Sequence, residues 1–403
     1  MPYVLLASGL LALLAAVNAL RPRRGLLLLV VSFLASWLTI ELAPWALAAE
    51  AVVTVLLVAG GGLDGPAGGL GLAATAAGWA GLAVVMVRAS RTTLTVREWS
   101  AGLELDPGDQ APAFPLSHVI FPVLMTRRRG VTRVRDIAYG DDPVMRLDVY
   151  KPSSPGGLRP GIMSVHGGAW LIGSKREQGI PLLNHLAAAG WVGLNVDYRL
   201  SPRAKFPDHL LDVKRAIKWY REHAEEHGAD PDFLCVTGGS AGGHLAALVA
   251  LTANVPEYQP GFENVDTSVR AAVPFYGVYD MGALIGNAPG LFGSFMERHV
   301  MGARRADDPE AYDRASPVHW IRADAPPFLV IHGDLDTVVP VTQARAFTER
   351  LGRTSAAPVL FAEMKGAQHA FDVFPSYRVA RVIEGAERFL TSVRRAERRQ
   401  AAS

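Results

Sequence analysis

Cysteine is almost absent from this sequence, since Cys235 is the only one among 403 residues. One cysteine cannot form an intrachain disulfide, and it cannot build a multi-cysteine metal site. Both a disulfide scaffold and a structural site of the zinc-finger type are therefore excluded.

Net charge is also small. The 40 lysines and arginines nearly balance the 38 aspartates and glutamates. A protein that binds nucleic acid usually carries a basic stripe with interleaved aromatic residues, and this sequence has neither. Nucleic acid is therefore not expected as a partner.

Charged residues are scarce in the first 87 positions, which contain long apolar stretches. Residues 2–20, 25–43 and 70–87 are each close to the roughly 20 residues that a helix needs to cross a bilayer. Residues 45–63 are ambiguous because they contain Glu50 and end in glycines. We predict three or four transmembrane helices within residues 1–88, hence a multi-pass protein of the cell membrane.

Three other interpretations of this region fit less well. A cleaved signal peptide would have a basic start, and residues 2–20 instead lead directly into a second apolar segment. Core helices of a soluble protein would carry a polar stripe, and these stretches are apolar on every face. A transporter would need more intramembrane polar groups than Glu41 and Glu50, which could equally lie near the interface.

The orientation depends on the number of spans. The positive-inside rule places "RPRR", residues 21–24, in the cytoplasm. Three spans then leave the rest of the chain in the cytoplasm, in agreement with Arg88, Arg91 and Arg97, whereas four place it outside. The connector, residues 89–130, includes an apolar run followed by "TRRRG". It could lie on the lipid surface or pack on the following domain.

From about residue 131 to 395 the pattern alternates between strands and helices. Residues 131–139 and 145–152 suggest an antiparallel pair, and buried strands separated by helices then follow. Such alternation predicts a mainly parallel sheet covered on both faces, with ligands bound at the carboxyl ends of its strands. Residues 281–325 break the rhythm and are expected to form a cap over the substrate pocket, or else a surface loop. Residues 396–403 are a basic and polar tail.

One motif within this domain carries chemistry. Residues 238–242, "GGSAG", have the G-x-S-x-G form between a predicted strand and a predicted helix, the context of a nucleophile elbow. Ser240 is therefore a candidate nucleophile, which needs a base and an acid that orients the base. Asp334 and Asp336 follow a later strand, and His369 follows the last one, in the chain order serine, acid, histidine.

Further segments resemble a known superfamily. "HGGAW" at 166–170, "DYRLSP" at 197–202 and "FPDHLLDVKRAIKW" at 206–219 are similar to α/β-hydrolases of the carboxylesterase and hormone-sensitive-lipase-like branch. This branch includes feruloyl-esterase-like enzymes, isoprenylcysteine methylesterases and kynurenine formamidases. The resemblance implies the α/β-hydrolase fold, and its H-G-x-x-D pattern implies that Asp336 is the acid. Ala169 and Trp170 depart from the H-G-G-G form of lipases.

The glycines after His166 suggest an oxyanion hole. Without side chains, Gly167 and Gly168 could direct their N–H groups into the site together with that of Ala241, although the same residues could form a plain turn. We predict a membrane-anchored serine hydrolase, carboxylesterase-like or lipase-like, that cleaves small-molecule or lipid esters through an acyl-enzyme. No metal or organic cofactor is implied.

Two alternatives use the same fold. The triad Ser240, His369 and Asp336 could cleave amides or peptides, or transfer the acyl group to an acceptor other than water. A catalytically idle hydrolase fold could instead serve as a binding module, although such a module would not need all three residues.

Overall fold

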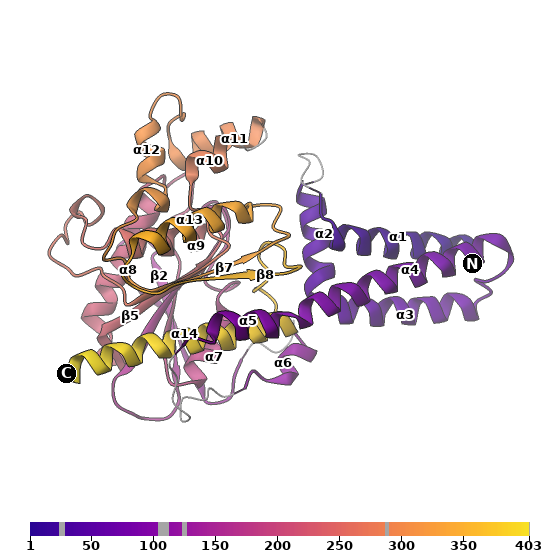
Figure 1. The fold of residues 1–403 in the computed structure, drawn as a ribbon, viewed down its shortest axis with the longest axis horizontal. Helices are drawn as coiled ribbons and strands as arrows, with labels where there is room; N and C mark the ends of the chain where they lie inside the picture. Colours follow the sequence, from indigo (N-terminus) through magenta and orange to yellow (C-terminus); the bar gives the residue numbers. More distant parts are fainter. Residues whose placement is uncertain (24–28, 104–112, 123–126, 287–289, 403) are drawn as a thin grey trace.

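The computed structural model describes the chain except for residues 24–28, 104–112, 123–126, 287–289 and 403. Two parts are distinct (Figure 1). Helices from the first 90 residues form an elongated bundle, and the following residues form a body built around one sheet. Helix α2 lies across the end of the bundle that faces the body.

The sheet has eight strands in the order β1-β2-β4-β3-β5-β6-β7-β8. The first two strands pair antiparallel with each other, β2 is antiparallel to β4, and all later pairs are parallel. The predicted antiparallel start and mainly parallel sheet are confirmed. The strands are β1 Val131–Ala138, β2 Arg146–Pro152, β3 Arg159–Val165, β4 Val192–Val196, β5 Ala229–Gly239, β6 Ala271–Phe275, β7 Phe328–Gly333 and β8 Val359–Met364.

Helices cover both faces of the sheet. The apolar side chains of β4 and β6 are buried on both sides, as expected for parallel strands between two helical layers. Leu210, Val213 and Ile217 recur at helical spacing and are fully buried, and each contributes about 1.5–3 kcal/mol by leaving water. One face packs against α8 Asp208–His223, α9 Ala241–Leu251 and α13 Val341–Thr354, and the other against α7 Ile180–Ala188 and α14 Tyr377–Ala402.

Small residues allow the bundle helices to pack closely. The helices are α1 Pro2–Leu20, α3 Ala43–Ala59 and α4 Gly65–Ser90. A Cβ atom at Gly9 would lie 2.3 Å from the carbonyl oxygen of Gly71, so α1 and α4 can approach each other only because these residues have no side chain. Large apolar side chains on the outside of the bundle are exposed, among them Leu11 and Leu56 at 67% each.

The structure corrects the second predicted span. Of residues 25–43, positions 25–28 lie outside the described residues, and α2 Leu29–Glu41 has 13 residues. At 1.5 Å per residue it is about 20 Å long, shorter than the roughly 30 Å of a bilayer core. It meets α3 at a 90° bend, where Pro44 in the first turn of α3 lacks the N–H that would continue a straight helix.

Within the part of the chain that the structure describes, two helices are long and apolar enough to cross a membrane: Pro2–Leu20, and the continuous helix Gly65–Ser100 that contains α4. The bent pair α2 and α3 gives a third if it is counted as one span. The ambiguous stretch 45–63 belongs mostly to α3.

The described part of the connector packs on the body. Helix α5 Thr92–Ser100 lies along α14, where a Cβ atom at Gly385 would be 2.6 Å from the ring of Trp99. A short helix, α6 Leu116–Ile120, follows. Arg128, from the basic run, also packs on the body. Its backbone N–H donates to Asn184 of α7, and its guanidinium group contacts His185.

The insertion is helical in its described residues rather than a loop. It contains α10 Met281–Gly286, α11 Gly290–Met296, a π-helical turn Glu297–Met301 and α12 Pro309–Arg314. These helices stand together at one end of the body (Figure 1). Residues 287–289 of the predicted cap lie outside the described residues.

Candidate active site

The turn that carries Ser240 links β5 to α9. Ser240 has φ 56° and ψ −119°, a strained conformation that costs of order 1–3 kcal/mol and occurs mainly at functional sites. Two glycines make the turn possible. A Cβ atom at Gly242 would lie 1.9 Å from the carbonyl oxygen of Val165, and one at Gly238 would lie 2.5 Å from the same atom. The turn therefore fits against β3 and raises Ser240 at the carboxyl end of the sheet.

The three predicted residues of the triad lie together. Ser240 Oγ is 2.8 Å from Nε2 of His369, and Nδ1 of His369 is 2.7 Å from Oδ2 of Asp336. Asp336 follows β7 and His369 follows β8, so the sheet brings together residues that are far apart in the sequence. The imidazole bridges the hydroxyl and the carboxylate.

Asp336 is buried and ionised. One carboxylate oxygen accepts the backbone N–H groups of Val338 and Val339, each at 2.8 Å, and the other faces His369. Nε2 of His332 lies 3.2 Å from that second oxygen. Burial alone raises the pKa of Asp336, but the attraction of His369 and the hydrogen bonds from both histidines outweigh it and hold the pKa well below its usual range.

Asp334, the other candidate acid, has a different place. Its carboxylate accepts the backbone N–H of Gly366 at 2.7 Å and lies 3.7 Å from the ammonium group of Lys365. Both partners belong to the turn after β8. Asp334 therefore stabilises this turn, whereas Asp336 alone of the two contacts His369.

The structure revises one of the three predicted oxyanion-hole donors. The N–H of Gly167 donates to Oε1 of Gln178 at 2.8 Å, so it is engaged within the protein. Gly168 adopts φ 118°, and a Cβ atom there would lie 2.0 Å from the carbonyl oxygen of Ile172. Ala241 is the first residue of α9, where a backbone N–H has no acceptor within the helix.

Sequence reasoning missed two residues beside His369. Gln368 is fully buried, and its side-chain oxygen accepts the N–H groups of Thr337 at 2.8 Å and of His369 at 2.9 Å. Tyr276 follows β6, and its ring centroid is 4.6 Å from that of His369. Its hydroxyl donates to Asp372, and burial, followed by this carboxylate, raises the pKa of Tyr276 well above its usual value. Neither residue belongs to a motif that a sequence would reveal.

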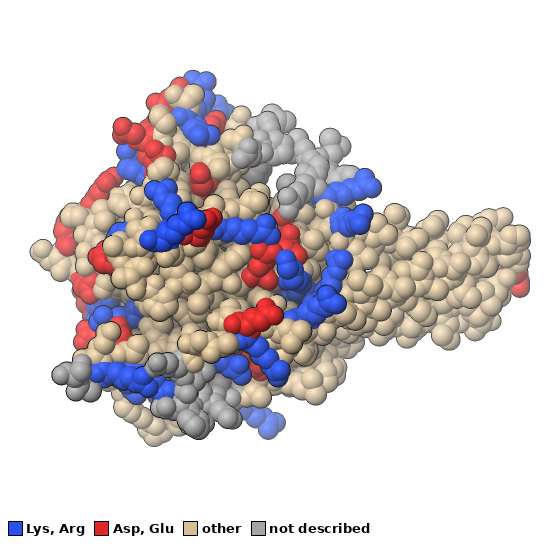
Figure 2. Space-filling model, viewed as in Figure 1, with Lys and Arg blue, Asp and Glu red and all other residues tan. Residues whose placement is uncertain are grey.

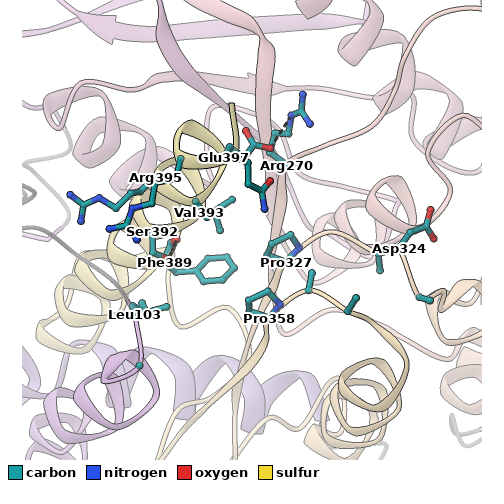
Figure 3. Close-up of a pocket in the computed structure, with 18 residues that line it drawn as sticks. Leu103, Arg270, Asp324, Pro327, Pro358, Phe389, Ser392, Val393, Arg395 and Glu397 are labelled. Atoms are coloured by element: carbon teal, nitrogen blue, oxygen red, sulfur yellow. Dashed lines mark hydrogen bonds and ion pairs between the residues drawn. The ribbon is translucent and has the colours of Figure 1, made fainter. Parts of the chain in front are cut away.

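A cavity of about 710 Å³ lies elsewhere in the body (Figure 3). Phe389 of α14 points toward Pro327 and Pro358, which immediately precede β7 and β8. This is the amino-terminal edge of the parallel strands, whereas Ser240 follows the carboxyl end of β5. The cavity therefore belongs to the opposite edge of the sheet from the serine.

Among the residues that the structure describes, no group of three or more histidines, cysteines, aspartates or glutamates could hold a metal ion. Three carboxylates do gather near β2, but around an ammonium group. Lys175 is buried, and its Nζ lies 2.5, 3.3 and 3.6 Å from Asp136, Asp148 and Asp197. This cluster ties the loop after β3 to the antiparallel edge of the sheet.

Comparison with known proteins agrees with the α/β-hydrolase architecture described above. The BD-FAE family profile matches residues 147–351. The chain is 47% identical over 261 residues to the probable carboxylic ester hydrolase LipM of Mycobacterium tuberculosis, which covers 64% of this chain and 61% of LipM. It is 43% identical over 298 residues to esterase LipC of the same organism, covering 72% of this chain and 73% of LipC.

A solved structure is also similar. The propionate-bound esterase 2 of Thermogutta terrifontis matches with a TM-score of 0.53 and 30% identity, over 65% of this chain and 94% of that one. The chain spans less than two thirds of the length of LipM. The profile match covers half of this sequence, and LipC matches over most of its own length. The chain therefore belongs to the BD-FAE family of α/β-hydrolases.

Proposed function

We propose that this protein is a membrane-anchored serine hydrolase that cleaves carboxylic esters. The observation that carries the proposal is the continuous chain from the Ser240 hydroxyl through the imidazole of His369 to the carboxylate of Asp336, with contacts of 2.8 and 2.7 Å. This is the arrangement that activates a serine for acyl transfer. Similarity to LipM and LipC, both named as ester hydrolases, supports esters as the substrate class.

The mechanism follows from these contacts. The Nδ1–H group of His369 donates a hydrogen bond to Asp336, which leaves Nε2 free to take the proton of Ser240 as the serine oxygen attacks the ester carbonyl. The tetrahedral oxyanion is held by the N–H groups of Gly168 and Ala241. His369 then protonates the leaving alcohol, and water activated by the same imidazole releases the acid from the acyl-enzyme.

Gly167 has a supporting part in this mechanism. Its N–H is fixed by Gln178, and a Cβ atom at Gly167 would lie 3.1 Å from Cβ of Ser240. The glycine therefore keeps the space beside the nucleophile open while Gln178 fixes the loop that presents Gly168. The oxyanion is then left to the backbone N–H groups of Gly168 and Ala241.

The bundle anchors the enzyme through α1, α3 and α4. Arg21 and Arg23 follow α1, and Arg88 and Arg91 stand at the end of α4, so all four lie at the end of the bundle next to the body. The far end carries Asp64 instead. In Figure 2 basic side chains gather where bundle and body meet, and the length of the bundle is almost uncharged. By the positive-inside rule, the catalytic domain faces the cytoplasm.

The test is hydrolysis of p-nitrophenyl esters of increasing acyl length by the full chain in mild detergent. Replacement of Ser240 by alanine should lower kcat by about a millionfold, as loss of such a nucleophile has done elsewhere. The matched control is Ser153→Ala, because Ser153 is a surface serine whose hydroxyl bonds to that of Thr132 in β1. If Ser240→Ala keeps more than a small percentage of the wild-type rate, Ser240 is not the nucleophile.

A further inference from the structure

One face of α2 contacts the segment that carries His369. Phe33, Ser36 and Trp37 occupy positions i, i+3 and i+4, so they project from the same side of the helix. That side meets the segment immediately before and after His369. The bundle is therefore in direct contact with the residues on either side of His369, more than 300 positions away in the sequence.

Ser36 completes the hydrogen bonding of Gln368. The side-chain oxygen of Gln368 accepts the backbone N–H groups of Thr337 and His369, which fixes the orientation of the amide. Its NH₂ group must then find an acceptor, and it donates to Oγ of Ser36 at 3.0 Å. The Ser36 hydroxyl donates in turn to the carbonyl oxygen of Phe33. Ser36 is fully buried, so water cannot replace it.

Trp37 holds the residue that follows the histidine. Its indole N–H donates to the carbonyl oxygen of Ala370 at 2.8 Å. Ala370 has φ 59°, in the left-handed region that residues other than glycine seldom adopt without support. The ring of Trp37 also stacks on Phe374 with centroids 5.0 Å apart, and the ring of Phe33 meets that of His369 edge-on at 6.1 Å.

A buried ion pair continues the same contact. Glu41, one turn after Trp37, accepts the hydroxyl of Ser376 at 2.6 Å and lies 3.2 Å from Nε of Arg378. Arg378 also donates to the carbonyl oxygens of Lys365 and Gly366. Helix α2 is therefore hydrogen-bonded to the chain both before His369, at Gln368, and after it, at Ser376.

We propose that α2 is part of the catalytic apparatus, with Ser36 and Trp37 as positioning residues that hold His369 in line with Ser240 and Asp336. The proposal rests on the proposed function of the triad. Neither residue touches the reacting atoms. Trp37 bonds the backbone carbonyl of Ala370, and Ser36 bonds the side chain of Gln368, which accepts the backbone N–H of His369. A displacement of the order of 1 Å in such a group costs about a hundredfold in rate, so two hydrogen bonds to adjacent residues matter for turnover.

The experiment measures ester hydrolysis by the full-length protein carrying Ser36→Ala, Trp37→Phe or both. We expect kcat to fall roughly tenfold for Ser36→Ala and by about a hundredfold for the pair, with KM within about twofold of wild type. A fall in kcat at a nearly unchanged KM separates a loss of alignment from a loss of substrate binding. Trp37→Phe keeps an aromatic ring but lacks the indole N–H that donates to Ala370, so a fall in its kcat tests the proposal even if Ser36→Ala does not fold.

The matched control is Thr54→Ala in α3. Thr54 is buried like Ser36 and donates its hydroxyl to the carbonyl oxygen of Glu50 at 2.7 Å, but this contact stays within the bundle. We expect its kcat to equal that of the wild type. An unchanged kcat in both α2 variants overturns the proposal, as does an equal fall in Thr54→Ala. If Ser240→Ala is fully active, the proposed triad itself fails, and this outcome is distinct from an active Ser36→Ala beside an inactive Ser240→Ala.

Discussion

The pair formed by Glu41 and Arg378 predicts a large loss of stability when one partner is removed. Both side chains are at most 1% exposed and lie 3.2 Å apart. Replacement of Glu41 by glutamine keeps the shape of the side chain but leaves the guanidinium charge buried without a counter-ion. Breaking a buried pair in this way costs about 3–5 kcal/mol. For a body of this size, roughly 2–4 °C per kcal/mol gives a fall in Tm of about 6–20 °C.

The assay is thermal unfolding of the full-length protein in one detergent, monitored by the ester hydrolysis that remains after heating to each temperature. The control is Glu222→Gln, because Glu222 pairs with Lys218 on the surface of α8, where such a pair contributes about 0.3–0.5 kcal/mol. The double variant Glu41→Leu with Arg378→Met removes both charges and should be more stable than Glu41→Gln. A Glu41→Gln protein that melts within 2 °C of Glu222→Gln, a margin set by the roughly 2–4 °C per kcal/mol above, would refute the reasoning.

The site leads to three more expectations. Asp336→Asn should lower kcat by about 10⁴-fold by favouring the wrong tautomer of His369, whereas Asp334→Asn should lower it far less, because Asp334 follows β7 and bonds the turn after β8 rather than His369. The pKa of Asp336 is held below its usual range, so the ionised carboxylate stabilises the folded state above about pH 4, and this stabilisation is lost on acidification. The difference in Tm between wild type and Asp336→Asn should therefore shrink as the pH falls through about 4 toward about 2. Gly168→Ala should abolish measurable turnover, since its Cβ would lie 2.0 Å from a carbonyl oxygen, and Gly157→Ala, with nothing within 4 Å, should leave it unchanged.

Much of the catalytic domain could be predicted because its signals are local. The G-x-S-x-G turn requires glycines where β3 passes closely, and these glycines are visible in the sequence. The alternation of buried strands and amphipathic helices predicted the parallel sheet. The sheet then places the residues after β5, β7 and β8 at one edge, so chain order alone indicated His369 and the two candidate acids.

The remaining features depend on contacts between distant segments. The hydrogen bond from Gly167 to Gln178 forms only once the loop after β3 has folded, and no sequence motif predicts it. The stretch 25–43 is apolar enough to suggest a span, but hydropathy averages over all faces of a helix. Ser36 and Glu41 both bond to residues of the catalytic domain, and these partners lie more than 300 positions away in the sequence.

The most direct test of the central claim is to label the full-length protein with a fluorophosphonate and locate the adduct by mass spectrometry of its peptides. The account predicts a single modified residue, Ser240, with labelling that slows strongly in His369→Ala and is absent from Ser240→Ala. Labelling of another residue, or equal rates with and without the imidazole, would contradict the assignment of Ser240, His369 and Asp336 as the catalytic triad.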